Sequence, residues 1–218
     1  MVYLNAPFTE TREKIYYFTA LTYYGRIRLI VNLLPLLRKA PALRRVVSVF
    51  GGTKEGPINP EDMQGRNLPI HKLRAHTSSL MTLALESLAL EAPDVSFVHA
   101  FPGSVRGTKI GRDVSSTAIT VKRAIAKVVG VLGTLSLSEA GERHLFLATS
   151  ARFPPRWIAD VETTTGVTLD DGIEIAKGSD RGQGSGVYSV DFHGEPSSHK
   201  VEEIVKAMRD DDLVRDVW

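Results

Sequence analysis

The stretch SFVHAFPGSV at residues 96–105 decides how we expect this chain to fold. An apolar and aromatic run leads directly into Pro102 and Gly103. Proline cannot donate a hydrogen bond inside a central strand, and glycine reaches backbone angles that other residues avoid. The stretch therefore predicts a buried strand that ends abruptly in a turn, with a backbone open to close approach.

Two other apolar runs of the chain have the same form. Residues 2–4 (VYL) and 46–50 (VVSVF) each end at small or turn-forming residues, and helical patterns at 11–39 and 71–91 separate the three runs. Near-continuous apolar strands that alternate with helices are typical of a parallel sheet with helices on both faces. We therefore expect one α/β domain over residues 1–218, with a Rossmann-like, doubly wound and mostly parallel sheet.

The pattern is weaker after Pro102. A helix is expected within residues 115–132, and another after Ser136, which stands three residues before Glu139 as in a capping box. Residues 186–194 (GVYSVDFHG) alternate like a strand, and a closing helix follows from about residue 198. These elements extend the α/β pattern toward the end of the sequence.

Composition excludes several classes of protein. The chain has 27 Lys and Arg against 25 Asp and Glu, and its basic region at 26–45 lacks interleaved aromatic residues, so we expect no nucleic-acid partner. Cysteine is absent and the histidines lack ligand spacing, so no metal site is expected. No run is long and apolar enough for a membrane span, and no secretory signal pattern stands at the start. We expect a cytoplasmic protein.

Ligands of open parallel sheets bind beyond the carboxyl ends of the strands. Asn5, Gly51 and the Pro102–Gly103 pair follow the three expected strands at that end. The sequence therefore predicts a binding site at this edge of the sheet.

Five motifs in this order resemble the short-chain dehydrogenase/reductase family. They are LNAP (4–7), NLLPLLRKA (32–40), RRVVSVFGG (44–52), FPGSVRGT (101–108) and the tail GVYSVDFHGE (186–195) with Trp218. The tail is similar to a fungal subgroup associated with secondary-metabolite gene clusters. The resemblance implies an oxidoreductase that acts on a carbonyl or alcohol of a secondary metabolite with NAD or NADP, and a homodimer formed through the two long helices.

The resemblance also implies which residues meet the cofactor. Positions that match the family's nicotinamide side are Asn5, Ala6, Gly51, Pro102, Gly103, Val105 and Thr108. No G-x-G-x-x-G is present in the chain, and the family's first half has no counterpart, so the resemblance is to an N-terminally incomplete member. We therefore expect weak or absent NAD(P)H binding by the 218-residue chain.

The family's catalytic set of Asn, Ser, Tyr and Lys is altered here. Its positions fall near Thr22, at Gly51 with Thr53 two residues on, at Lys72 and at His76, and no Tyr lies between Tyr24 and Tyr188. Lys72 and His76 have i, i+4 spacing, so His76 is a candidate proton donor tuned by Lys72, and a solvated helix start is the alternative. Thr22 and Thr53 are the candidate hydroxyls. For the whole chain, the alternative to an oxidoreductase is a non-catalytic remnant or binding module without a cofactor.

Overall fold

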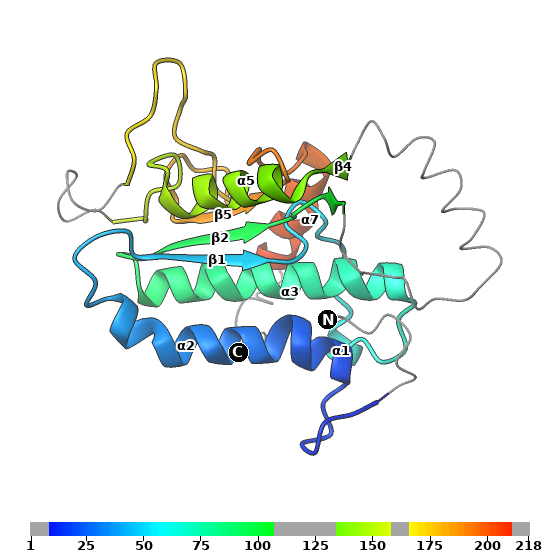
Figure 1. Cartoon of the computed structure of the whole chain (residues 1–218). Coiled ribbons are helices and arrows are strands. Elements are labelled where there is room, and N and C mark those ends of the chain that lie inside the picture. The colour runs from blue at the N-terminus through cyan, green and yellow to red at the C-terminus, as the bar shows by residue number, and fades with distance from the viewer. Residues whose placement is uncertain (1–8, 107–133, 158–165, 211–218) are drawn as a thin grey trace.

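The computed structural model describes residues 9–106, 134–157 and 166–210. Within these residues, the main sheet has three parallel strands in the order β1–β2–β5 (Figure 1). The strands are β1 (Arg45–Val49), β2 (Ser96–Ala100) and β5 (Val187–Val190). Because all three run in the same direction, their carboxyl ends meet at one edge of the sheet.

Helices cover both faces of this sheet. In Figure 1, α2 (Gly25–Leu37) and α3 (Ile70–Glu91) lie on one side of the strands, and α5 (Leu137–Thr149) lies on the other. A last helix, α7 (His199–Asp210), packs against α3. The α/β class and the Rossmann-like, mostly parallel sheet are confirmed.

The two faces of the sheet bury two separate apolar clusters. Phe97 and Val187 pack with α3, whereas their neighbours Val98 and Tyr188 pack with Phe153 on the α5 side. All four residues of β5 are buried, so this strand does not alternate between core and solvent as the sequence pattern suggested. A parallel strand with helices on both faces has no solvent side.

Helix α3 is the central helix of the domain, with 13 of its 22 residues buried. It follows Pro69 and ends just before Pro93, as expected because a residue before proline avoids the helical conformation. Its buried face includes Thr77 and Ser78, whose hydroxyls donate to the carbonyls of Leu73 and Arg74 at 2.9 and 2.8 Å. These bonds satisfy two buried polar side chains.

The segment expected as one helix over 11–39 has three parts. They are α1 (Tyr17–Thr19), the π-helical turn η1 (Ala20–Tyr24) and α2. Pro35 lies in the last turn of α2, and the helix ends two residues later. The π turn shifts the helical register between α1 and α2.

Short elements complete the described chain. A 3₁₀ turn, η2 (Pro60–Asp62), lies between β1 and α3, and β3 (Ser104–Val105) pairs in parallel with β4 (Thr134–Leu135). The predicted cap of α5 is confirmed, because the Ser136 hydroxyl accepts a hydrogen bond from the Glu139 N–H at 3.1 Å. The strand expected at 2–4 and the helix expected within 115–132 lie outside the described residues.

Arg45 joins β1 to the end of α5 and to the residues that follow that helix. Its guanidinium donates to the carbonyls of Leu147, Ser150 and Phe153 at 3.1, 2.8 and 2.7 Å. One side chain of the basic region at 26–45 is therefore used inside the fold. No helix in the described part of the chain has the length and apolar character to cross a bilayer.

Candidate functional site

The loops after the three strands meet at the carboxyl edge of the sheet. The Phe50 N–H donates to the Ala100 carbonyl at 2.8 Å, and the Phe101 N–H donates to the Val190 carbonyl at 2.9 Å. The strands thus stay paired up to the residues where the loops begin. Gly103 has φ +71°, and a Cβ there would lie 3.0 Å from the Cβ of Phe192, so the turn after β2 packs against the loop after β5.

The loop after β1 is held close to its neighbours. A Cβ on Gly51 would lie 2.1 Å from the Ser78 hydroxyl oxygen, and one on Gly52 would lie 2.1 Å from the His99 carbonyl oxygen. Both glycines are therefore required by packing against α3 and β2. The next residue, Thr53, has φ +62°, a left-handed conformation that is strained for a β-branched side chain.

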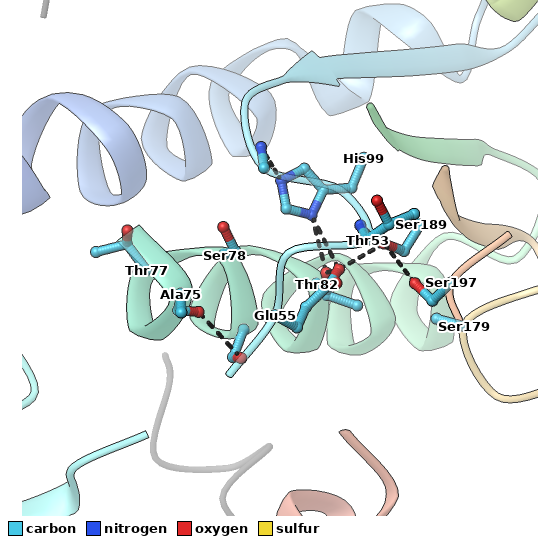
Figure 2. A network of polar contacts seen from close by, with 12 residues as sticks. Thr53, Glu55, Ala75, Thr77, Ser78, Thr82, His99, Ser179, Ser189 and Ser197 are labelled. Atoms are coloured by element: carbon cyan, nitrogen blue, oxygen red, sulfur yellow. Dashed lines mark hydrogen bonds and ion pairs between the residues drawn. The ribbon is translucent and has the colours of Figure 1, made fainter. Parts of the chain in front are cut away.

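A buried polar cluster lies beneath this loop (Figure 2). The Glu55 side chain is fully buried, and its Oε1 accepts hydrogen bonds from the hydroxyls of Thr82 on α3, at 2.7 Å, and Ser189 on β5, at 2.5 Å. The Ser189 hydroxyl oxygen in turn accepts the Thr53 N–H at 2.8 Å and the Ser197 hydroxyl at 3.3 Å. One carboxylate therefore connects the ends of two strands and the central helix.

The tautomer of His99 follows from its partners. The Gly51 N–H donates to Nε2 at 3.1 Å, so the ring proton is on Nδ1, which lies 2.9 Å from the Thr82 hydroxyl and 3.6 Å from Glu55 Oε1. His99 thus donates to Thr82, and Thr82 donates to Glu55 (Figure 2). His99 is a buried core histidine with both ring nitrogens engaged.

Glu55 remains ionised in this cluster. Burial raises the pKa of Glu55. The opposing effect of His99 and of the Ser189 and Thr82 hydroxyls is larger, so the pKa lies below its ordinary value. Its second oxygen, Oε2, is buried and has no hydrogen-bond partner among the described residues. A buried carboxylate of this kind concentrates negative charge under the candidate site.

His76 and Lys72 have different environments. His76 is buried, its Nδ1 accepts the Asn59 N–H at 3.1 Å, and its Nε2 donates to the Met63 carbonyl at 3.1 Å. Burial lowers the pKa of His76, with only partial opposition from the Met63 carbonyl and Asp62, so the imidazole is neutral near pH 7. Lys72 is exposed to solvent. Their helical spacing therefore does not create a shared environment.

The two candidate hydroxyls also differ. Thr22 is buried in η1, and its hydroxyl donates to the Phe18 carbonyl one turn earlier, at 2.8 Å. Thr53 lies at the sheet edge, and its Oγ1 is buried with no hydrogen-bond partner among residues 9–106, 134–157 and 166–210. The Thr53 hydroxyl is therefore unsatisfied within the described ranges, whereas the Thr22 hydroxyl is satisfied.

The predicted cofactor residues divide into two groups. Gly51, Pro102, Gly103 and Val105 all lie in or just after the loops at the carboxyl edge. The others, Asn5, Ala6 and Thr108, lie outside the described residues.

Glu55, Thr82 and Ser189 were not identified from the sequence. Glu55 lies in a polar loop, where the sequence alone predicts a solvent-exposed side chain. Hydroxyl residues within apolar stretches, such as Thr82 on α3, are a sequence signal of buried polar contacts. Within the described ranges, no three metal-ligating side chains gather into a possible metal site.

Comparison with known proteins adds a chemical class. No family model matches the chain. It is 35% identical over 212 residues to "Oxidoreductase AN1596" of Emericella nidulans. The aligned region covers 96% of this chain and 61% of that protein. It is 32% identical over 214 residues to "NmrA-like family domain-containing oxidoreductase notO" of Aspergillus sp. (strain MF297-2), which covers 96% of this chain and 57% of that protein.

A third similarity is shorter. "Short-chain dehydrogenase/reductase SAT2" of Stachybotrys chartarum is 35% identical over 91 residues, 39% of this chain and 26% of that protein. The chain spans about three fifths of the length of the first two relatives. Along nearly all of its own length, the chain is similar to fungal oxidoreductases.

Proposed function

We propose that this chain forms the nicotinamide and substrate end of an oxidoreductase site, which interconverts a carbonyl and an alcohol of a small secondary metabolite with NADH or NADPH. The observation that supports this most directly is the meeting of three loops at the carboxyl edge of a parallel sheet, with the Thr53 hydroxyl among them, which has no hydrogen-bond partner among the described residues. The names of the fungal relatives support the same class of reaction.

The residues at this edge fit the nicotinamide end of such a cofactor. The Pro102–Gly103 turn follows β2 directly and packs against Phe192 of the loop after β5, and Thr53 has a buried, unsatisfied hydroxyl within the described ranges. When bound, the cofactor would supply or accept the hydride. The chain's own part is to bind the carboxamide or the substrate oxygen and to keep water away from it.

Thr53 is a better candidate than His76 for contact with a reacting oxygen. Both ring nitrogens of His76 are engaged by the loop at residues 59–63, so a proton transfer from this ring would first break a buried hydrogen bond. The Thr53 hydroxyl has a hydrogen to donate and no competing acceptor in the described part of the chain. The alternative of a non-catalytic binding module is not favoured by the relatives.

A binding experiment on the 218-residue chain tests the proposal. Purified protein is titrated with NADPH and NADH by nicotinamide fluorescence, and with reduced nicotinamide mononucleotide and adenosine 2′,5′-bisphosphate by NMR. We expect weak binding of the dinucleotides and a response to the nicotinamide fragment but not to the adenosine fragment. Absence of any response to the reduced nicotinamide mononucleotide would overturn the proposal.

Two variants at one position serve as a matched pair in this titration. Thr53→Ser keeps the hydroxyl, whereas Thr53→Val keeps the branched shape and removes the hydroxyl. We expect Thr53→Ser to bind the nicotinamide fragment like the wild type, and Thr53→Val to bind it about five- to tenfold more weakly because one hydrogen bond is lost. Equal binding by both variants would remove Thr53 from the site.

A further inference from the structure

We propose that Glu55 and Ser189 are positioning residues, which hold Thr53 in its left-handed conformation so that its hydroxyl faces a bound molecule. The identity of that molecule rests on the function proposed above. The positioning itself stands on the hydrogen bonds and backbone angles of the buried cluster.

The backbone of Thr53 is strained. The Lys54 N–H donates to the Gly51 carbonyl at 3.0 Å, which closes a four-residue turn with Thr53 at its third position. That position has φ +62° here, and turns of this kind favour glycine or asparagine there. A β-branched residue persists in this conformation only when its surroundings impose it.

A long-range hydrogen bond imposes the left-handed conformation on Thr53. The Thr53 N–H donates to the Ser189 hydroxyl oxygen at 2.8 Å, across 136 residues of sequence. The turn after β1 is therefore fastened to the end of β5, the strand on the far side of β2. A local turn sequence alone would not supply this restraint.

Glu55 orients the hydroxyl of Ser189. A serine hydroxyl has one hydrogen, and at Ser189 that hydrogen is directed to the carboxylate of Glu55, which can only accept. The lone pairs of Ser189 are thereby left for the Thr53 N–H. Thr82 donates to the same carboxylate oxygen and fixes it against α3 (Figure 2).

The same restraint also fixes the position of the Thr53 side chain. With its backbone N–H bound to Ser189, its hydroxyl is buried and lacks a partner in the described ranges. A buried donor without an acceptor is costly, and an amide or ketone oxygen of a ligand would satisfy it. Because Oγ1 is itself buried, local rearrangement must expose it first, and the restraint on the backbone fixes its position before binding.

Amide hydrogen exchange measures the positioning without any activity assay. We expect Ser189→Ala to accelerate exchange of the Thr53 amide by about tenfold, since its acceptor is removed. Glu55→Ala should have a similar effect, whereas Glu55→Gln should retain protection because the amide oxygen still accepts from both hydroxyls. Ser197→Ala is the matched control, because Ser197 contacts Ser189 but not Thr53, and it should leave the exchange unchanged.

A second readout is binding of reduced nicotinamide mononucleotide by the same variants. Ser189→Ala should weaken it severalfold with the β2 amides still protected, and Ser197→Ala should not. Unchanged exchange at Thr53 in both Ser189→Ala and Glu55→Ala would overturn the positioning. If the wild type does not bind the fragment, the proposed function fails, while the exchange result still decides the positioning.

Discussion

Replacement of Glu55 by alanine is the most informative test of the buried cluster. It removes the acceptor of two buried hydroxyls, those of Thr82 and Ser189, and leaves a gap where the side chain was. Each buried donor without a partner costs roughly 1–3 kcal/mol. Removal of the buried charge, and of an Oε2 that has no hydrogen-bond partner in the described part of the chain, offsets part of this loss. We expect the free energy of unfolding to fall by about 3 kcal/mol.

Equilibrium unfolding in urea, followed by circular dichroism at the helical band, measures this change. In a chain of this size, about 3 kcal/mol corresponds to a melting temperature lower by roughly 6–12 °C. Glu139→Ala is the control, because Glu139 is 44% exposed and pairs with Arg143 one turn away, so its removal should cost less than about 1 kcal/mol. A cost below about 1 kcal/mol for Glu55→Ala would show that the cluster does not stabilise the fold.

The ionisation of Glu55 also makes stability depend on pH. Its pKa is lower in the folded chain than in the unfolded chain, so its ionised form favours folding at pH above the unfolded value. This contribution is lost as the pH falls through the folded pKa. Glu55→Gln cannot titrate, and the stability difference between wild type and this variant should shrink as the pH falls from 6 to 3. A difference that is constant over this range in urea titrations would contradict an ionised Glu55.

Three further predictions follow from packing and hydrogen bonding. Gly51→Ala should destabilise the fold by about 2 kcal/mol, and combination with Ser78→Ala should recover about 1 kcal/mol in a double-mutant cycle, because the new Cβ meets the Ser78 hydroxyl; additive losses would contradict the close contact. Arg45→Met should lower the unfolding free energy by about 3 kcal/mol, since three charge-assisted bonds to backbone carbonyls are lost; an unchanged urea midpoint would show that these bonds contribute nothing. Tyr188→Phe should cost about 1 kcal/mol, because a buried 2.6 Å bond to a carbonyl disappears, and a gain in stability would contradict it.

Much of the central layer could be predicted from the sequence. The strands at Arg45–Val49 and Ser96–Ala100 and the helix Ile70–Glu91 match the expected ranges to within one residue. The two strands are apolar runs that end close to Gly51 and Pro102, and the helix has apolar residues at helical spacing between Pro69 and Pro93. The start of the first helix was placed at residue 11 rather than at Tyr17. The residues before Tyr17 form a turn instead, with Lys14 at φ +60° and an isolated antiparallel bridge between Glu10 and Tyr16.

The candidate site could be located but not assembled. Parallel strands ending in Gly51 and Pro102 predict the edge where the loops meet, which follows from strand direction alone. The roles of Glu55 and Arg45 could not be predicted, because each is buried by partners more than 25 residues away in sequence. The sequence alone predicts that a charged residue is exposed to solvent, and only the arrangement of the elements around it shows otherwise.

The bond between Glu55 and Ser189 joins residues 134 positions apart, and this separation determines the order of assembly. β1, α3 and β2 can pack as the chain emerges, but the Glu55 carboxylate then lacks one of its hydroxyl donors and must stay hydrated. Only when β5 docks on β2 does that water leave. Closure of distant contacts is the slow part of folding a parallel sheet. We therefore expect the left-handed turn at Thr53 to be among the last features of the domain to form, so that a nascent chain completes its sheet edge in one late step.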